Sequence, residues 1–535
     1  MDDRISMPPS VIGTVSSYPD MLAQQAKMQP DAVAVFTADA CITYGDLMAR
    51  SSLVAGALHR AHIRRGQHVG LLIGNRIDWL AIAFGVMKIG ATAVPLSTWS
   101  TRDELEFLLG DAQIELLFVD PDFKGCDFVG DVGAIAARGG FQKRVVQLDG
   151  KPSDFAVQVS DFLDGAQPIS EVATGISDED ALILYTSGST SKPKGVRLTH
   201  CLTVRNGFQI GERQGLRTGD RVFLSAPLFW SFGSANALPA AFTHGAALVL
   251  MERFEPVSAL QLIQQRACTA IYTLPAMTNA MVRSDGFDRS QTRSLRTGLT
   301  IGTAEDFMNA SENLGVPELC NVYGATETCG NCAATPHDWP VERRRVCQGP
   351  PLDGQFIRIR DPDTQAIVPE GGIGLVEVKG QISAGYTGVS AALNSTAFTQ
   401  DGYYCTGDLG RINEFGAFVF VGRQTEMIKR QGINVSPAEI EEVMKKFKGV
   451  SECAVVGIPD ADKGELIFAC IVPVSGNLDV GELDQFCRIH LSRYKIPDVY
   501  ELWDALPLTP TGKLQRKEVK ALAQRTIAAG RGATA

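Results

Sequence analysis

Short apolar strand patterns alternate with helical periods through much of the chain, and this alternation restricts the fold more than any other feature. Buried-strand patterns cover residues 32–36, 68–73, 92–96 and 116–120, with helical periods at 44–60 and 78–89 between them. The alternation returns as strands at 221–227, 246–251, 270–274 and 294–300 with a helix at 257–266. Since parallel strands need long crossover connections, usually helices, the pattern predicts an α/β fold of parallel sheets with crossover helices.

From about Gly354 onward, the pattern of predicted secondary structure changes. Short strands at 356–360, 375–380 and 418–421, joined by tight turns, predict a small antiparallel sheet or barrel-like subdomain. Ser436-Pro437-Ala438-Glu439 then has the composition of a helix start with a serine cap, and later strand and helix patterns complete a small α+β unit. We expect a large N-terminal domain at 1–423 and a small mobile C-terminal domain at 424–535.

Composition and charge exclude several classes of function. The chain has 535 residues, with 50 Lys and Arg against 60 Asp and Glu, so its formal net charge is −10. Such an acidic balance argues against general binding of nucleic acid or membrane surfaces. The first residues lack the apolar core of a signal peptide, and Lys88 interrupts the most apolar stretch, so we expect a cytoplasmic protein without a membrane span.

Twelve cysteines are spread thinly along the chain, which predicts free thiols. Cys329 and Cys332 form a C-x-x-C pair, but Cys320 and Cys347 lie too far apart in sequence to complete a zinc site of the usual spacing. A metal site and a redox pair are therefore disfavoured against small thiols that line a pocket.

A glycine- and hydroxyl-rich loop follows an apolar strand at residues 181–184. Its backbone N–H groups, hydroxyls and lysine could grip a polyphosphate. A polar surface loop is the alternative, because Pro193 stands where the common phosphate-loop motif has its second glycine. The candidate phosphate-binding residues are Thr186, Ser187, Gly188, Ser189, Thr190 and Lys194.

Four further segments complete a recognisable set of motifs. They read YGATE at 323–327, YCTGD at 404–408, GR at 422–423 followed by GINVSPAEIE at 432–441, and LPLTPTGK at 506–513. In this order and spacing the five segments resemble the adenylate-forming superfamily, in its acyl-CoA synthetase branch. The resemblance covers roughly residues 20–522 and implies an ATP-dependent ligase that makes an acyl-adenylate and passes the acyl group to CoA, with ATP, Mg²⁺ and coenzyme A as cofactors.

The resemblance assigns roles to individual residues. Lys513 would be the mobile catalytic lysine, Thr326 would donate to phosphate or acyl oxygen, and Glu327 would be the catalytic carboxylate and Mg²⁺ ligand. The other implied nucleotide- and CoA-binding residues are Ala304, Val322, Tyr323, Gly324, Asp408, Arg423, Lys429, Gln431, Gly432 and Asn434. A hinge movement of the small domain would exchange Lys513 for the Gly432 loop between the two half-reactions.

The expected acid-binding residues mix small and bulky apolar side chains. They are Trp230, Phe232, Ala235, Cys329 and Gly330. The resemblance implies that an enzyme of the peptide-synthetase branch, which activates amino acids, would have an aspartate in this region for the amino group. The segment 229–232 has no acidic residue, so we expect an apolar acid that is fatty, alicyclic or aromatic. The chain also departs from the family pattern at Ser191, Thr425 and Trp230.

Several alternatives remain open at this point. The acceptor could be a carrier protein instead of free CoA, or the departures could mark a thioester-forming enzyme impaired in adenylation. The expected partners are the small acid and CoA, with a carrier protein and a homodimer left open.

Overall fold

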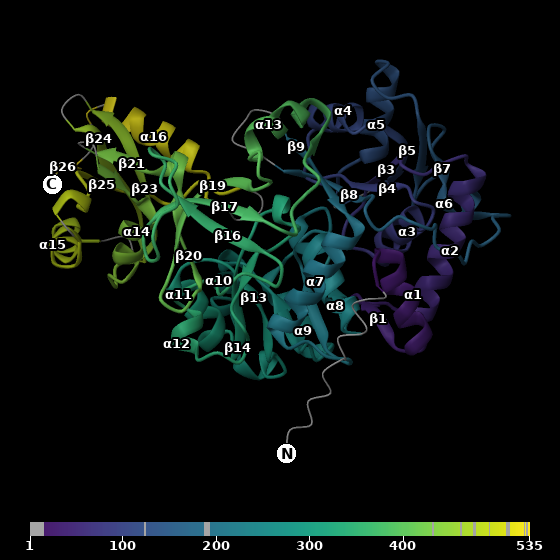
Figure 1. The fold of residues 1–535 in the computed structure, drawn as a ribbon, viewed down its shortest axis with the longest axis horizontal. Helices are drawn as coiled ribbons and strands as arrows, with labels where there is room; N and C mark the ends of the chain where they lie inside the picture. The colour runs from purple at the N-terminus through teal and green to yellow at the C-terminus, as the bar shows by residue number, and fades with distance from the viewer. Residues whose placement is uncertain are drawn as a thin grey trace. The chain divides into compact units, whose positions relative to one another are not determined.

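The computed structural model describes residues 15–121, 123, 125–186, 193–430, 433–460, 463–474, 478–491, 493–509, 514–528, 530 and 533–534; of 433, 434, 533 and 534 only the backbone is described. The chain forms two units (Figure 1). Unit 1 comprises Met1–Ile357 and Val378–Cys405, and unit 2 comprises Arg358–Glu377 and Thr406–Ala535. The domain boundary expected between residues 423 and 424 stays a prediction.

Unit 1 contains two eight-stranded sheets that are mostly parallel. The first has the order β15 (Ala333–Ala334), β14 (Glu318–Tyr323), β13 (Thr297–Thr300), β12 (Ala270–Tyr272), β10 (Arg221–Leu224), β11 (Ala247–Leu250), β1 (Val33–Phe36) and β2 (Cys41–Thr43). The second has the order β18 (Tyr386–Thr387), β9 (Lys194–Thr199), β8 (Asp180–Thr186), β4 (Thr92–Pro95), β3 (His68–Leu72), β5 (Ile114–Val119), β6 (Arg144–Gln147) and β7 (Val157–Gln158). Among the strand pairings that the structure describes in these two sheets, only β1–β2, β14–β15, β8–β9 and β9–β18 are antiparallel, so the predicted parallel α/β fold is confirmed.

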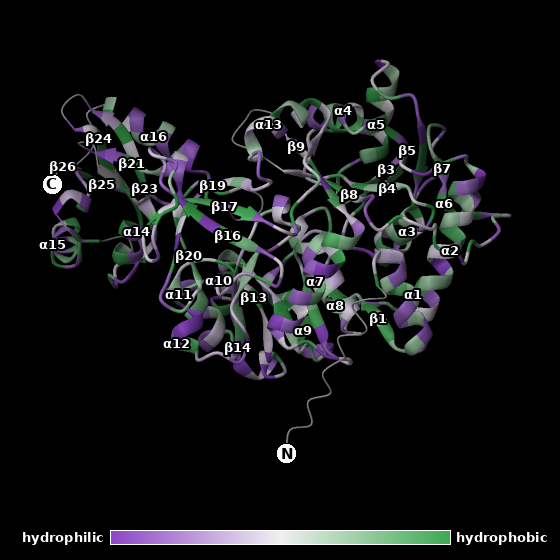
Figure 2. Ribbon diagram, in the orientation of Figure 1, coloured by the Kyte–Doolittle hydropathy of each residue, from purple (hydrophilic) through white to green (hydrophobic). Residues whose placement is uncertain are grey.

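Helices connect the strands of unit 1, as a parallel sheet requires. They are α1 (Tyr18–Met28), α2 (Tyr44–Arg60), α3 (Ile77–Lys88), α4 (Arg102–Asp111), α5 (Phe128–Ala137), α6 (Val159–Leu163), α7 (His200–Gln214), η2 (Ser231–Ala237), α8 (Leu238–Thr243), α9 (Pro256–Gln265), α10 (Pro275–Val282), η3 (Arg289–Thr292), α11 (Ala304–Met308), η4 (Asn309–Asn313), η5 (Thr326–Thr328), α12 (Val341–Arg344), η6 (Gly388–Leu393) and α13 (Asn394–Ala397). Figure 2 shows hydrophilic residues on α7 and α12, whereas strands such as β8 are mainly hydrophobic.

The largest core of unit 1 includes α2, α3 and α8. The Phe242 ring lies 5.0 Å from the Tyr44 ring and 5.8 Å from the Phe84 ring, centroid to centroid. Helix α3 is buried on nearly all sides, which agrees with its continuous apolar sequence. Lys88 at its end is also buried, and its Nζ donates to Ser52 Oγ at 2.7 Å.

Unit 2 contains most of a four-stranded sheet, ordered β16 (Phe356–Arg360), β17 (Gly374–Lys379), β19 (Tyr404–Ile412) and β20 (Phe418–Arg423). A second sheet has the order β22 (Ile433–Val435), β21 (Ile428–Arg430), β24 (Gly464–Pro473), β25 (Val499–Leu502) and β26 (Ala533–Thr534), with β23 (Val450–Asp460) also paired to β24. Its helices are η7 (Gln424–Glu426), α14 (Pro437–Lys445), α15 (Val480–His490), η8 (Arg493–Lys495) and α16 (Arg516–Ala528). The predicted small α+β unit is therefore present.

The helix start at Ser436 differs in one detail from the prediction. Ser436 is the N-cap residue of α14, but its side chain makes no capping hydrogen bond. Its hydroxyl instead donates to the carbonyl oxygen of Val421 at 3.0 Å, which ties the helix to β20. The sequence pattern located the helix correctly, whereas a tertiary contact takes the hydroxyl that the cap would have used.

Within the described part of the chain, no helix combines the length and the hydrophobicity that a membrane crossing needs. The expected cytoplasmic location stays a prediction.

Candidate active site

The turn after β14 carries two of the residues for which the sequence predicts a catalytic role. Thr326 and Glu327 form the start of the short helix η5, directly beyond the carboxyl end of a parallel strand. Ligands of open α/β sheets bind at this edge, because the loops that follow the strands converge there. The Thr326 hydroxyl lies 3.1 Å from Ser231 Oγ, at the start of η2, which follows β10. The structure thus brings together residues from the segments that follow β14 and β10, two strands that are not adjacent in the sheet.

The carboxylate of Glu327 is buried and held by a tyrosine that the sequence analysis missed. Only 8% of the Glu327 surface is exposed, and Tyr386 donates its hydroxyl to Glu327 Oε1 at 2.8 Å. Burial, followed by the negative charge of Glu327, raises the pKa of Tyr386 and of Tyr404 above the ordinary tyrosine range. Both tyrosines therefore stay protonated at neutral pH.

Tyr386 also links Glu327 to the phosphate-binding segment expected from the sequence. Strand β18, which carries Tyr386, pairs with β9 so that Thr387 lies opposite Gly195. The Nζ of Lys194, at the start of β9, lies 5.6 Å from the centre of the Tyr386 ring. Thr186 lies opposite Lys194 in the β8–β9 pairing. A hydroxyl, a lysine and a buried carboxylate thus occupy neighbouring positions, whereas Ser187, Gly188, Ser189, Thr190 and Ser191 lie outside the described residues.

The residues expected to border adenine follow two adjacent strands. Val322 and Tyr323 end β14 and are buried, and Gly324 follows them at the surface. Ala304 begins α11, just beyond β13. Thr303 caps this helix in a reciprocal arrangement with Asp306, which fixes the start of the helix beside the expected adenine site.

Asp408 and Arg423 form a pair within unit 2. They lie opposite each other in the β19–β20 register, and Arg423 Nε lies 3.2 Å from Asp408 Oδ1. The carboxylate is largely buried and the guanidinium is exposed. This arrangement leaves the arginine accessible to an anion.

The remaining unit 2 candidates are only partly described. Lys429 is exposed on β21, and its backbone N–H donates to Glu465 Oε2 at 2.8 Å. The backbone of Asn434 lies opposite Lys429 in the β21–β22 pairing. The side chain of Asn434, and Gln431, Gly432 and Lys513 altogether, lie outside the described residues. Leu508 and Leu514, which flank the segment containing Lys513, form an antiparallel bridge.

The expected acid-binding residues gather around η2 and the turn after η5. Phe232 contacts the Tyr272 ring at 5.0 Å between centroids. Ala235, Cys329 and Gly330 are buried, and Cys329 has a positive φ of 56°, which is uncommon for a residue with a side chain. Burial raises the pKa of the Cys329 thiol to about 12, so it is a neutral wall group and not a nucleophile at neutral pH.

An aromatic cluster surrounds Trp230. The Trp99 ring lies 5.1 Å from the Trp230 ring and 5.0 Å from the Phe229 ring, in edge-to-face arrangements. Trp99 remains 39% exposed. The sequence analysis missed Trp99 because it lies in another loop, after β4, and no local pattern connects the two segments.

Comparison with known proteins decides the family. The AMP-binding enzyme family matches residues 22–387, and the AMP-binding enzyme C-terminal domain matches residues 439–513. The chain belongs to the AMP-binding enzyme family. Membership of its acyl-CoA synthetase branch makes the chain an AMP-forming acid–CoA ligase.

Individual relatives cover nearly the whole chain. Feruloyl-CoA synthase of an Amycolatopsis species is 30% identical over 506 residues, covering 93% of this chain and 97% of the relative. The crystal structure of the anthranilate CoA ligase AuaEII in complex with anthranoyl-AMP is 26% identical, with a TM-score of 0.87 over 96% of this chain and 98% of that one. ATP-bound MatB from Rhodopseudomonas palustris is also 26% identical, with a TM-score of 0.84 over 95% of this chain and 99% of that one. These matches confirm the fold and the family that the motifs predicted.

Proposed function

We propose that this enzyme activates an apolar carboxylic acid with ATP and transfers the acyl group to coenzyme A. The observation that carries the proposal is the placement of Thr326 and Glu327 at the carboxyl edge of β14, with Tyr386 linking Glu327 to Lys194. A hydroxyl donor, a carboxylate and a cation are the groups that a phosphoryl-transfer site needs, since such catalysis consists mainly of positioning and charge neutralisation.

In the first half-reaction, a carboxylate oxygen of the acid attacks the α-phosphorus of ATP. The new O–P bond forms as the bond to the β-phosphate oxygen breaks, which yields acyl-AMP and diphosphate. Lys194 would bind phosphate oxygens, and Thr326 would donate to the α-phosphate or the acyl oxygen. Lys513 would stabilise the negative charge that develops at the phosphorus.

Residues at this site also fit the expected magnesium ion. Within the described parts of the chain, no group of three or more His, Cys, Asp or Glu side chains could hold a metal. A single buried carboxylate suits Mg²⁺ that takes its other ligands from phosphates and water. Glu327 would hold the ion, which when bound neutralises phosphate charge.

In the second half-reaction, the thiolate sulfur of CoA attacks the acyl carbonyl carbon. The thiol has first lost its proton to solvent; the C–S bond then forms as the bond to the AMP oxygen breaks, and AMP is released. Asp408 would accept the ribose hydroxyls, and Arg423 would bind at the ribose and phosphate. Lys429, Gln431, Gly432 and Asn434 would contact AMP or CoA after the small domain has turned.

The residues of the expected acid site best fit a compact, apolar acid that carries a ring. Trp99, Phe229 and Trp230 offer an aromatic surface beside the expected acid site, and rings pack well edge to face on such a surface. Two of the relatives described above are named for aromatic acids, ferulic and anthranilic acid. Fatty and alicyclic acids remain within the proposed class.

Exchange of labelled diphosphate into ATP tests the proposal directly. The purified enzyme, Mg²⁺ and a panel of aromatic, alicyclic and fatty acids should give acid-dependent exchange, and addition of CoA should then produce AMP with loss of free thiol. Exchange without CoA consumption would favour a carrier protein as acceptor. No exchange with any acid, but thioester formation from supplied acyl-AMP, would mean that adenylation is lost.

Lys513→Ala separates the two half-reactions. Because the role proposed for Lys513 belongs to adenylation alone, the variant should lose exchange by ~100-fold or more. Its rate of thioester formation from supplied acyl-AMP should stay within about threefold of the parent, a difference of less than ~1 kcal/mol in barrier. Equal losses in both assays would show that Lys513 has another role.

A further inference from the structure

Three buried polar side chains from separate elements form a chain that ends beside the expected acid site. They are Gln214 at the end of α7, Tyr272 at the end of β12 and Asn236 in η2, and each is fully buried. Gln214 Nε2 donates to the Tyr272 hydroxyl at 2.9 Å, and that hydroxyl donates to Asn236 Oδ1 at 3.0 Å.

The donor and acceptor in each of these hydrogen bonds follow from the contacts of the Gln214 amide group. Gln214 Nε2 also donates to the carbonyl oxygen of Ile210 at 3.2 Å, an atom that can only accept. The Tyr272 hydroxyl must therefore accept from Gln214 and donate to Asn236, since burial raises its pKa and keeps its proton in place. This leaves the Nδ2 group of Asn236, with its two N–H donors, as the outer end of the chain.

Asn236 Nδ2 has no hydrogen-bond partner among the described residues, although it is buried. The position of this amide group relative to the expected acid site follows from Gly330, one of the expected acid-binding residues. A Cβ atom placed on Gly330 would lie 3.4 Å from Asn236 Nδ2, 3.4 Å from Asn206 Oδ1 and 3.5 Å from the carbonyl oxygen of Ala235. Asn206 Oδ1 accepts from the backbone N–H of Asn331 and makes no hydrogen bond to Asn236 Nδ2. Gly330 has a φ of 118°, so a side chain is disfavoured there and the amide stays uncovered on that side.

The helix that carries Asn236 also contacts the turn after β14, which contains Thr326 and Glu327. Helix η2 is a π-helix, a rare form that is frequent at functional sites. Its first residue, Ser231, receives the hydrogen bond from Thr326. The same short segment therefore contacts Thr326, the residue proposed to act on the α-phosphate, and carries the Asn236 amide donor near Gly330.

We propose that Asn236 selects the acid by donating a hydrogen bond to an oxygen on its acyl part, remote from the carboxylate. This inference rests on the proposed function and narrows the substrate class to apolar acids that carry one acceptor, such as a ketone, ether or hydroxyl oxygen. A buried donor without a partner is costly, whereas a bound acceptor removes that cost, so the selection acts against acids with a methylene at the same position.

Paired acids test the assignment. Each pair consists of a ring-bearing keto acid and its methylene analogue, with the carbonyl moved stepwise away from the carboxylate. The parent enzyme should favour the keto acid of at least one pair by ~10–100-fold in kcat/KM for diphosphate exchange. Asn236→Leu should reduce that ratio to within about threefold of one, mainly by loss of the keto acid's rate.

A second variant and a control keep the test independent of folding defects. Tyr272→Phe keeps the amide but removes the hydroxyl that orients it, so the ratio should fall to an intermediate value. Gln147→Leu is the matched control, because Gln147 is another fully buried amide whose Oε1 has no hydrogen-bond partner in the described structure, and it lies in the other sheet, on β6. Its ratio should equal that of the parent.

The outcomes separate the two proposals. If the parent exchanges diphosphate with several acids but shows no preference in any pair, or if Asn236→Leu retains the preference, the amide does not face the acid and the inference fails while the proposed function stands. If the parent shows no exchange with any acid, the proposed function fails, and the selectivity assigned to Asn236 fails with it.

Discussion

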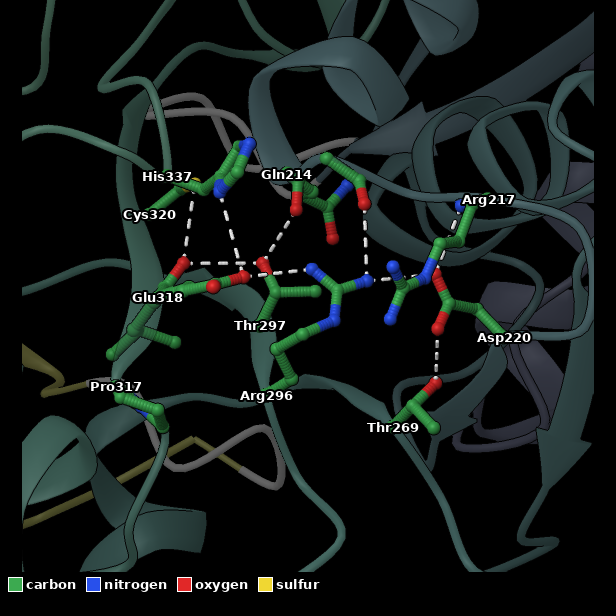
Figure 3. A network of polar contacts seen from close by, with 12 residues as sticks. Gln214, Arg217, Asp220, Thr269, Arg296, Thr297, Pro317, Glu318, Cys320 and His337 are labelled. Atoms are coloured by element: carbon green, nitrogen blue, oxygen red, sulfur yellow. Dashed lines mark hydrogen bonds and ion pairs between the residues drawn. The ribbon is translucent and has the colours of Figure 1, made fainter. Parts of the chain in front are cut away.

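The two edges of the first eight-stranded sheet hold polar side chains in opposite ways. At the amino ends of its parallel strands, Arg296 lies 2.8 Å from Asp220 and 2.7 Å from Glu318, and its Nη2 also donates to the carbonyl of Gly215 (Figure 3). Thr269 adds a hydrogen bond to Asp220 at 2.8 Å. At the carboxyl ends, Asn236 ends its chain with an unpartnered donor among the described residues.

This difference indicates which polar groups serve the fold and which serve a ligand. Opposite charges that satisfy one another within the chain stabilise the packing of strand ends and leave little to offer a substrate. A buried donor whose partner is missing has a free-energy cost that a ligand can remove. The comparison therefore places chemistry at one edge of the sheet and stability at the other.

The largest expected effect comes from Glu327→Gln at the carboxyl edge. The variant keeps an acceptor for Tyr386 but removes the charge that would hold Mg²⁺, so kcat/KM for diphosphate exchange should fall by ~100–1,000-fold. Glu318→Gln, at the other end of β14, is the matched control and should change the rate by less than about threefold. Similar losses of activity in both variants would contradict the assignment of the chemistry to the carboxyl edge alone.

Arg296→Met tests the amino edge and should act on stability. It would leave Asp220, which is 4% exposed, without its guanidinium partner, so the free energy of unfolding should fall by about 1–3 kcal/mol. Denaturant unfolding measures this change, and exchange activity per folded molecule should remain near that of the parent. A large loss of activity at unchanged stability would contradict the structural role.

A smaller effect is expected from Lys88, a buried lysine whose Nζ donates to two neutral groups, Ser52 Oγ and Met48 Sδ. Burial lowers the pKa of Lys88 to about 8, below its ordinary value of 10.5. The unfolded chain therefore binds more protons between these values, and this group makes stability rise with pH across that window. Lys88→Met should remove the rise and raise the unfolding free energy at pH 7 by about 1–2 kcal/mol. Thermal unfolding from pH 7 to 10.5 tests this, and an unchanged pH slope would contradict it.

Local patterns were sufficient to predict many helices and strands. The helix predicted at 44–60 coincides with α2, and the adjacency of Asp408 and Arg423 follows from two strands that pair in register. The motifs could single out these residues as candidates because each lies within a short segment whose composition suggests its chemistry.

Long-range contacts account for what the sequence could not provide. Tyr386 reaches Glu327 only because β18 pairs with β9, and Asn236 is defined by Gln214 and Tyr272 from two other elements. An asparagine among small apolar residues gives no local signal of a ligand-facing donor. Such assignments require the hydrogen-bond partners of each atom to be known.

The most direct test of the account is a crystal structure with Mg²⁺ and the sulfamoyl-adenosine analogue of the acid that gives the fastest exchange. The account predicts that the acyl-sulfamate link lies against Thr326 and Glu327 and that the acyl part extends past Gly330 toward Asn236. An analogue bound elsewhere, with the carboxyl edge of β14 unoccupied, would contradict it.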